Sequence, residues 1–401
     1  MNELMQLNYK LLSVFVFQNV LKNEAISTLM NVFAQSEISL SEAMVKYSKF
    51  LKILYESEFK GNFSLYLQNL IKYDDNIFSR ACAKSQEIDE NVKNAVKNEL
   101  EIFAQLSQIS TQKIKESLLN KFSGAQEIVG NLANFSNSEF VLNYDDLKEN
   151  FQKNCFGIFA KYCAFVFDSN LKLLPVADVD KISLNDLKDY DAQKQKLYQN
   201  TKAFVLGKGA NNVLLYGDRG CGKSSGVKAV FNEFKDEGLK IVQILKSNLA
   251  NLDKLIELLS KIPAKFIIFI DDLSFNEESE NLSTFKSVLE GALSAPKENI
   301  LIYATTNRRH IVKETFSTRE GNEVHLADTM DENASLSDRF GIILTYLSLN
   351  KDKYLEVARK IAQDKGIDIS CDFDVQAERF AILKSSRSPR VACQFVKSLQ
   401  K

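Results

Sequence analysis

Residues 216–226, YGDRGCGKSSG, decide the fold predicted for this chain. They hold four of its 15 glycines, although the chain is 401 residues long. Within them, residues 217–224 read GDRGCGKS and fit the pattern G-x-x-x-x-G-K-[ST]. Consecutive backbone N–H groups can wrap a phosphate chain only where the backbone curls through conformations that glycine adopts at little cost. The stretch therefore predicts a phosphate-binding loop between a strand and a helix.

Each position of this loop has an expected task. Lys223 places a positive charge on the β- and γ-phosphates, and the Ser224 hydroxyl can ligate Mg²⁺. The N-terminus of the following helix points its free N–H groups at the anion. A plain strand–helix turn is the alternative reading. The predicted nucleotide-binding residues are Gly217, Asp218, Arg219, Gly220, Cys221, Gly222, Lys223, Ser224 and Ser225.

A second motif lies 48 residues after the lysine, where the apolar run KFIIFI (265–270) is followed by Asp271 and Asp272. Two carboxylates after an apolar strand are costly to bury unless a cation or hydrogen bonds compensate them. Asp271 is predicted to bind Mg²⁺ through water, and Asp272 to polarise an attacking water. The alternative is that either aspartate caps the next helix.

The region that contains these motifs predicts an α/β fold. From residue 212 onward, short apolar runs alternate with amphipathic helical segments, a pattern typical of a parallel sheet covered on both faces. Three helical segments over 352–365, 374–384 and 388–399 predict a small bundle after the sheet. The predicted strands are 213–216, 240–245, 265–270, 299–304 and 341–347.

The first 150 residues predict helices almost throughout. Over 39–59, apolar residues recur at helical spacing, and Ser39 with Glu42 predicts a capping box at the start. The same spacing returns over 92–122. Nothing in this half predicts catalytic chemistry.

Residues 11–21, LLSVFVFQNVL, are apolar enough to suggest a signal peptide. Gln18 and Asn19 interrupt the run and no small-residue cleavage site follows, so a buried helix is the expectation. No run of 18 or more apolar residues occurs, so no membrane span is predicted.

Composition excludes some classes of protein. The net charge is -1, from 51 basic and 52 acidic residues, which does not favour a nucleic-acid-coating protein. Six cysteines without CxxC spacing and two histidines do not predict a structural zinc site. Scattered cysteines fit a reducing compartment, and a cytoplasmic location is expected.

The motifs occur in the order found in AAA+ ATPases, which this chain resembles over roughly residues 185–401. GDRGCGKS is similar to the Walker A motif, FIIFIDD to Walker B and IYATTN (302–307) to sensor 1, while SLSDRFG and SPRVA follow at 335–341 and 388–392. More closely, the chain resembles a bacterial AAA+-like family of ATP-binding proteins of unknown function. ATP and Mg²⁺ are the cofactors that this resemblance implies.

The resemblance also implies roles for three further residues. Asn307, at the end of sensor 1, would orient the attacking water, with a strand-ending turn as its alternative. Arg339 would act in trans as an arginine finger in a homo-oligomer, or else pair with Asp338 at the surface. Arg390 aligns with the sensor 2 arginine, although Arg387 lies close enough in sequence to be confused with it.

One departure from the AAA+ pattern concerns catalysis. Walker B usually ends in Asp-Glu, whereas this chain has Asp271-Asp272. Slow hydrolysis is therefore one expectation, and a base that works through an additional water is the other. Cys221 is expected to act as a plain small residue, with redox regulation through a stabilised thiolate as its alternative.

The predicted architecture is an α/β parallel-sheet P-loop NTPase of AAA+ type with a C-terminal helical lid and a mostly helical N-terminal domain. Its domains are 1–150 (helical), 151–184 (connector containing strands), 185–349 (ATPase core) and 350–401 (lid). The predicted function is Mg²⁺-dependent ATP hydrolysis that remodels or loads a partner. An ATP-driven switch with little turnover and a P-loop small-molecule kinase are the alternatives.

The partner is expected to be a protein bound by the helical N-terminal domain. Arg308, Arg309 and His310 follow sensor 1, but they are too few to predict nucleic-acid binding. No membrane partner is expected.

Overall fold

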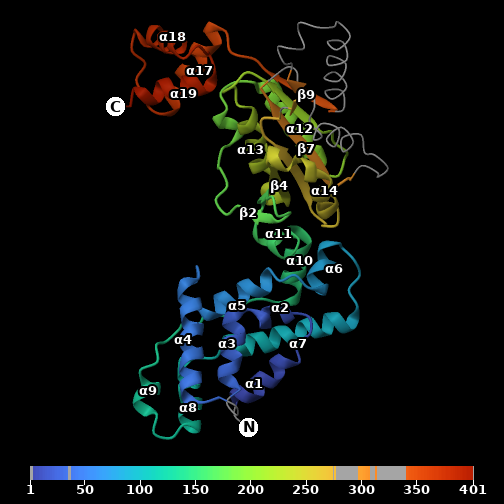
Figure 1. Ribbon diagram of the computed structural model, residues 1–401, viewed down its shortest axis with the longest axis vertical. Helices are drawn as coiled ribbons and strands as arrows, with labels where there is room; N and C mark the ends of the chain where they lie inside the picture. The colour runs from blue at the N-terminus through green and yellow to red at the C-terminus, as the bar shows by residue number, and fades with distance from the viewer. Residues whose placement is uncertain are drawn as a thin grey trace. The chain divides into compact units, whose positions relative to one another are not determined.

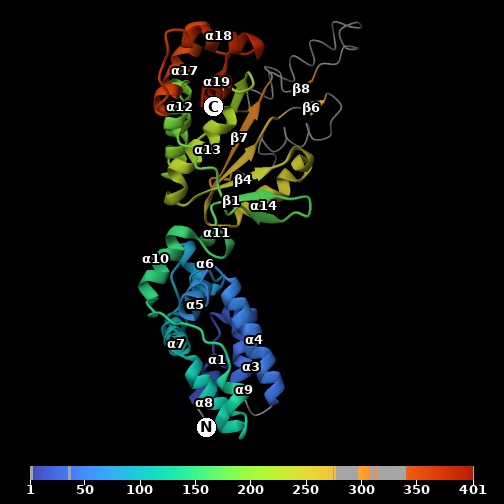
Figure 2. The same ribbon diagram turned by 90° about the vertical axis from the view of Figure 1, so that its left-hand side faces the viewer.

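A computed structural model describes residues 3–34, 38–273, 275–276, 297–307, 312–313 and 340–400 (Figures 1 and 2). The chain divides into two compact units, Met1–Lys161 and Tyr162–Lys401. The finer domain boundaries given above stay predictions. Across the described ranges, no helix combines the length and the apolar character that crossing a membrane requires.

The first unit is built from helices (Figure 1). Apolar side chains at three- and four-residue spacing turn inward from them and form its core, which includes the fully buried Phe33, Tyr47, Phe50, Phe63 and Phe103. Its helices are α1 (Glu3–Leu12), α2 (Gln18–Lys22), α3 (Glu24–Phe33), α4 (Leu40–Glu56), α5 (Phe63–Lys72), α6 (Ile77–Ala83), α7 (Glu90–Ser107), α8 (Thr111–Lys121), α9 (Gln126–Gly130), α10 (Tyr144–Asn154) and α11 (Ile158–Lys161).

Two helical predictions in this unit have different outcomes. The capping box is confirmed, because the Ser39 hydroxyl accepts from the Glu42 N–H while the Glu42 carboxylate accepts from the Ser39 N–H. The periodic stretch 92–122, by contrast, is interrupted between α7 and α8. The Ser110 hydroxyl caps α8 by accepting from the Lys113 N–H, so a new helix begins there.

The buried helix expected over 11–21 is wrong. Helix α1 ends at Leu12, and α2 does not begin until Gln18. The buried Glu99 carboxylate accepts hydrogen bonds from the N–H groups of Phe15, Val16 and Phe17, at 2.9, 3.0 and 3.0 Å. These donors therefore bond to a side chain 82 to 84 residues away in sequence, which the local pattern does not reveal.

The second unit contains a seven-stranded sheet in the order β2-β1-β4-β5-β7-β3-β9. Every neighbouring pair is parallel except β1 with β2. A separate parallel pair consists of β6 (Phe275–Asn276) and β8 (Val312–Lys313). The sheet strands are β1 (Ala164–Phe167), β2 (Leu173–Pro175), β3 (Val213–Gly217), β4 (Leu239–Ile244), β5 (Lys265–Ile270), β7 (Ile300–Thr306) and β9 (Ile342–Tyr346).

All five strands expected from the apolar runs are present, and their parallel pairing confirms the predicted α/β class. These runs are recognisable because strands in a covered parallel sheet are apolar on both faces. The stretch expected as a connector also supplies β1, which pairs with β4 as well as with β2.

Helices cover the sheet on both sides (Figure 2). Helices α12 (Asp191–Val205) and α13 (Lys223–Phe234) pack Leu197, Phe204 and Val230 into one core with the inward side chains of β3, β5 and β7. Helix α14 (Leu252–Ser260) lies on the other side of the strands. The remaining short turns are η1 (Leu184–Asp186), η2 (Lys235–Glu237) and η3 (Lys246–Asn251).

The predicted helical bundle after the sheet is confirmed as α17 (Lys351–Asp364), α18 (Phe373–Leu383) and α19 (Pro389–Ser398). Tyr354, Phe373 and Phe395 are buried in a core of its own. The Ser388 hydroxyl caps α19 by accepting from the Val391 N–H, and Pro389 occupies the first helical position, where its missing N–H costs nothing.

Candidate functional site

The glycine-rich loop connects β3 to α13, as the sequence predicts. Gly217 has φ +138°, and a Cβ there would lie 1.9 Å from the Tyr346 carbonyl oxygen in the adjacent strand β9. Gly222 has φ +90° immediately before α13. These positions therefore require glycine for two reasons, close backbone approach at Gly217 and a left-handed turn at Gly222.

Lys223 is 6% exposed and lies over the loop. Its Nζ donates to the carbonyl oxygens of Gly217 and Asp218, both at 2.7 Å. Burial lowers the pKa of this ammonium group, against the opposing effect of nearby acidic side chains. A lysine held by its own loop carbonyls can exchange them for phosphate oxygens without leaving the site.

Asp271 joins the two predicted motifs. The Ser224 hydroxyl donates to Asp271 Oδ1 at 2.6 Å, and the Thr305 hydroxyl donates to the same oxygen at 2.6 Å. Strand β7, which carries Thr305, lies between β5 and β3 in the sheet. The carboxyl ends of three neighbouring parallel strands therefore bring these groups together, as expected at such a sheet edge.

Asp272 adopts a left-handed backbone conformation, with φ +57°. Its N–H donates to the Thr305 hydroxyl at 2.9 Å, which fixes the turn. The Asn307 amide donates to Asp272 Oδ1 at 2.5 Å, and Lys246 Nζ lies 2.9 Å from Asp272 Oδ2. Asp272 therefore faces the predicted water-orienting amide and a lysine that the sequence did not single out.

One cavity of about 900 Å³ is lined by Lys223, Ser224, Asp271, Asp272 and Asn307, together with residues of the lid. The volume falls within the range of small-molecule and cofactor sites. It brings together these predicted site residues: Arg219, Gly220, Cys221, Gly222, Lys223, Ser224, Ser225, Asp271, Asp272, Asn307 and Arg390.

Two predicted residues are placed differently. Gly217 and Asp218 do not line the cavity, since Gly217 packs against Tyr346 and the Asp218 side chain bonds to Ser348. Arg339 lies outside the described residues, as do Arg308, Arg309 and His310.

The lid contacts the loop through backbone atoms. The Arg390 N–H donates to the Gly220 carbonyl oxygen at 3.2 Å. A Cβ at Gly220 would lie 2.8 Å from Ser388 Oγ and 3.1 Å from Arg390 Cβ. Glycine at this variable position of the motif therefore permits the lid to approach. Arg387 instead forms an ion pair with Glu378, so of the two lid arginines Arg390 is the one that lines the cavity.

Cys221 is 1% exposed, and burial raises the pKa of its thiol. A raised pKa keeps the thiol protonated at neutral pH and lowers its reactivity. This geometry favours the role of a small packing residue over redox regulation.

Sequence reasoning missed Thr305, Lys246 and Lys188. Thr305 stands two residues before Asn307 in the sensor 1 motif, so the signal was a hydroxyl at the end of a buried strand. Lys246 follows β4, at the same sheet edge as Asp272. Lys188 lines the cavity and forms an ion pair with Asp364 of the lid, a long-range contact with no local signal.

The hydroxyl of Ser224 and the carboxylate of Asp271 suit Mg²⁺, which prefers oxygen ligands and commonly takes only one or two from the protein. Among the residues that the structure describes, no cluster of three or more histidine, cysteine or acidic side chains could hold a metal ion by itself. The donor set thus fits a metal that also binds phosphate oxygens.

Residues 160–401 match the family described as "Protein of unknown function (DUF815)". The chain belongs to this family. The matched residues include the loop, both aspartates and the lid, so the whole cavity lies within the DUF815 region. No curated protein matches the sequence.

Solved structures of RuvB, titled as a Holliday junction branch migration motor of Thermotoga maritima, are similar to part of this chain. The parent protein has 17% sequence identity and a TM-score of 0.39, over 55% of this chain and 64% of that chain. A single-substitution variant of it has 19% identity and a TM-score of 0.38, over the same shares. The chain thus spans under two-thirds of RuvB.

The sheet order, the glycine-rich loop after β3 and the helical lid identify the DUF815 region as an α/β P-loop NTPase fold of AAA+ type. This agrees with the fold class expected from the order of the sequence motifs.

Proposed function

We propose that this chain binds ATP with Mg²⁺ in the 900 Å³ cavity and hydrolyses it to ADP and phosphate. The observation that carries the proposal is the convergence of Lys223, Ser224, Asp271, Asp272 and Asn307 on one cavity beneath a helical lid. This convergence matters because catalysis of phosphoryl transfer depends mainly on positioning and electrostatic stabilisation.

The loop and Lys223 would bind the phosphates. The N–H groups at the start of α13 offer hydrogen bonds and the positive end of the helix dipole. Lys223 would move its hydrogen bonds from the Gly217 and Asp218 carbonyls to phosphate oxygens. Ser224 and Asp271 would hold Mg²⁺, which neutralises phosphate charge when bound.

Asp272 and Asn307 would act on the attacking water. The Asp272 carboxylate can accept a proton from water, while the Asn307 amide holds that carboxylate in place at 2.5 Å. The Thr305 hydroxyl fixes the backbone of Asp272 by accepting a hydrogen bond from its N–H. The side chain is one methylene shorter than the glutamate usual in AAA+ proteins, so slow turnover is expected.

The AAA+ fold suggests an oligomer in which Arg339 completes the site of a neighbouring subunit. The helical first unit is the proposed site for a protein partner that the ATPase remodels or loads. A cytoplasmic location belongs to the same proposal, and rests on the cysteine pattern alone.

Phosphate release by the full-length chain tests hydrolysis. Asp272→Asn keeps the side-chain shape but removes the base, so turnover is expected to fall by about 10²-fold or more while ATP binding persists. Asp253→Asn, on exposed surface of α14, is the matched control. Equal turnover in Asp272→Asn and the parent chain would show that Asp272 is not the base.

An ATP-driven switch with little turnover is a second candidate, favoured by the Lys246–Asp272 contact of 2.9 Å. A carboxylate engaged by a lysine is a poorer base. If this contact restrains turnover, Lys246→Ala is expected to raise phosphate release. A fall in the variant would instead favour an active role for Lys246 in hydrolysis.

A further inference from the structure

An arginine without a partner lines the nucleotide cavity. Arg219 is exposed in the glycine-rich loop, and among the residues that the structure describes its guanidinium forms no hydrogen bond and no ion pair. Two other cations of the cavity are already engaged, since Lys223 donates to two loop carbonyls and Lys188 pairs with Asp364. A guanidinium has five N–H donors and is permanently charged, so Arg219 offers unused donors to an anionic ligand.

The backbone on either side of Arg219 is held in place. The N–H of Asp218 donates to the Tyr346 carbonyl oxygen at 2.8 Å. The carbonyl oxygen of Gly220 accepts from the Arg390 N–H at 3.2 Å. When an anion binds, only the side chain of Arg219 has to be ordered, which limits the entropic cost of the contact.

The order of the strands places Arg219 beside the amide proposed to act on the attacking water. Strands β3 and β7 are neighbours, and Tyr216 pairs with Thr306 in their register. Gly217 and Asn307 are the next residues along the two chains, which therefore leave the sheet at the same edge. Arg219 follows Gly217 by two residues and lines the same cavity as Asn307. It thus lies at the end of the cavity where a γ-phosphate has to sit for this water to attack it.

The charges at this end of the cavity favour a second cation. Asp271 and Asp272 bring two carboxylates, whereas Lys223 is the one ammonium group among the residues proposed above to act in hydrolysis. In the transition state, negative charge spreads over the outer oxygens of the phosphoryl group. A planar guanidinium can donate to two of these oxygens at once. Arg219 is the unpaired group of the loop that meets this requirement.

We propose that Arg219 is a catalytic residue, which donates hydrogen bonds to the γ-phosphoryl oxygens of a nucleotide bound by the same chain. This inference rests on the proposed function, ATP hydrolysis in this cavity. In that reaction the water oxygen bonds to the γ-phosphorus, and Asp272 accepts a water proton. The bond from the γ-phosphorus to the bridging oxygen breaks, and ADP leaves with the electron pair. Arg219 stabilises the charge on the transferring group, in addition to the contribution proposed for Arg339 from a neighbouring subunit.

Single-turnover hydrolysis by the full-length chain, with γ-labelled ATP and Mg²⁺, tests the proposal. Arg219→Ala is expected to lower the rate by about 10²–10³-fold, the usual effect of losing one donor to a developing charge. Arg219→Lys keeps the charge without the planar fork and is expected to recover only part of the rate. Arg379→Ala is the matched control, because Arg379 is an exposed arginine of α18 that does not line the cavity.

Calorimetry gives a readout that does not depend on turnover. ADP lacks the γ-phosphate, so Arg219→Ala is expected to keep its affinity for ADP with Mg²⁺ within about twofold. Aluminium fluoride bound with ADP imitates the transferring phosphoryl group, and transition-state analogues bind far more tightly than ground states. The tightening of ADP binding by aluminium fluoride is expected to be at least about tenfold smaller in Arg219→Ala. A merely structural role in the loop would weaken both kinds of binding alike.

A mixed assembly tests whether Arg219 acts within its own chain. Arg219→Ala and Lys223→Ala chains with different affinity tags are co-expressed and purified over both tags. The Lys223→Ala chain keeps Arg219 but is expected to bind no nucleotide. Hydrolysis by assemblies that carry both tags is expected to stay at the level of Arg219→Ala alone. If no such assembly is recovered, Arg219 has no neighbouring site to act on, which also agrees with the proposal.

Three results would overturn the proposal. The first is hydrolysis by Arg219→Ala at the rate of the parent chain. The second is no tightening of ADP binding by aluminium fluoride in the parent chain, or equal tightening in Arg219→Ala. The third is restored hydrolysis in the mixed assembly, which would mean that Arg219 acts on a neighbouring subunit. Failure of the proposed function is distinguishable, because the parent chain itself would then bind no ATP with Mg²⁺ or release no phosphate from it.

Discussion

The Asp218 carboxylate accepts a hydrogen bond from the Ser348 N–H at 2.7 Å. Asp218 belongs to the phosphate-binding loop, and Ser348 lies in the connection between β9 and α17 of the lid. The Asp218 N–H also donates to the Tyr346 carbonyl oxygen at 2.8 Å. The hydrogen bond from Ser348 lowers the pKa of the Asp218 carboxyl group. The loop is thus attached to the segment from which the lid leaves the sheet.

Removing this carboxylate is expected to loosen the lid. Asp218→Ala should raise hydrogen exchange at residues 347–350 and in α19 of the nucleotide-free chain, at a stability cost of about 1 kcal/mol. Asp218→Asn keeps an acceptor oxygen and should remain close to the parent chain. Unchanged exchange in Asp218→Ala would mean that the contact does not restrain the lid.

The contact between the lid and Gly220 gives a second prediction. Gly220→Ala should weaken nucleotide binding several-fold, because the new Cβ would crowd Ser388 and Arg390. Gly366→Ala is the matched control, since Gly366 also has positive φ, at +64°, but no atom lies within 4 Å of its Cβ position. In both variants, placing alanine at a positive φ angle destabilises the chain by about 1–2 kcal/mol. Equal nucleotide affinities, measured by calorimetry, would contradict a role for the lid contact.

Thr305 is predicted to position both aspartates. Thr305→Val removes its bond to Asp271 and the acceptor for the Asp272 N–H. Phosphate release should fall about tenfold or more, with a smaller effect on ATP affinity. Thr305→Ser keeps the hydroxyl and should restore most of the turnover. A Thr305→Val chain as active as the parent would rule out this positioning role.

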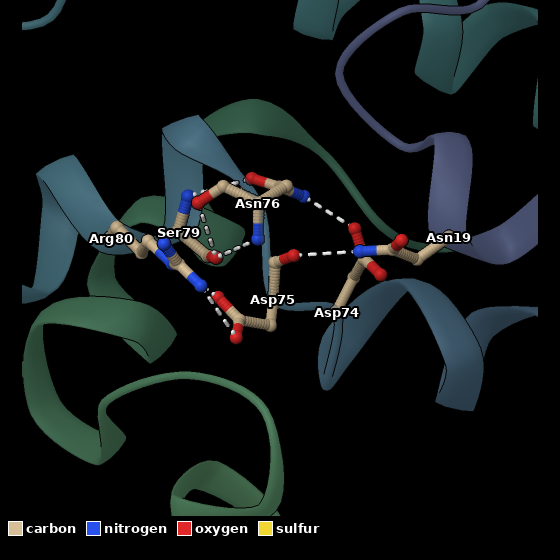
Figure 3. Close-up of polar contacts among 6 residues, drawn as sticks. All are labelled: Asn19, Asp74, Asp75, Asn76, Ser79 and Arg80. Atoms are coloured by element: carbon tan, nitrogen blue, oxygen red, sulfur yellow. Dashed lines mark hydrogen bonds and ion pairs between the residues drawn. The ribbon is translucent and has the colours of Figure 1, made fainter. Parts of the chain in front are cut away.

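A buried carboxyl group in the first unit gives a pH prediction (Figure 3). Asp74 is 6% exposed and accepts from the Asn76 amide at 2.6 Å, while Asn19 donates to the Asp75 carbonyl oxygen at 2.7 Å. Burial raises the pKa of Asp74 from its ordinary 3.8 to about 6. The neighbouring Asp75 carboxylate instead forms an ion pair with Arg80.

Because its pKa is raised on folding, Asp74 contributes stability that is fully present below about pH 4 and is lost as the pH rises through about 6. Asp74→Asn removes this loss, which is on the order of 2–3 kcal/mol at neutral pH. Calorimetric unfolding of the full-length chain should show the variant more stable near pH 7.5, with a smaller advantage near pH 5. Asp75→Asn, which breaks the exposed ion pair with Arg80, is the control. A destabilised Asp74→Asn chain near pH 7.5 would contradict the assignment.

The sheet could be predicted from the sequence because its strands are apolar runs bounded by turns. The run KFIIFI coincides with β5, and NILIYA predicts most of β7. The breaks between helices could not be predicted in the same way. The connection between α1 and α2 depends on Glu99, and a contact across more than 80 residues leaves no trace in a local pattern.

The candidate site could likewise be predicted from the sequence only in part. Lys223, Ser224 and Asp271 follow from spacing and strand position, since parallel strands end at one edge. Thr305 and Lys246 join them only through the order of strands in the sheet. The bond between Asp218 and Ser348 could not be foreseen either, because the motif assigns Asp218 to the nucleotide.

The central claim is that the cavity above Lys223 binds a nucleotide polyphosphate with Mg²⁺. Isothermal titration calorimetry of the full-length chain with ATP, with and without Mg²⁺, tests it most directly. The account predicts Mg²⁺-dependent binding that Lys223→Ala abolishes. Absence of binding to the parent chain, or the same affinity in Lys223→Ala, would contradict it.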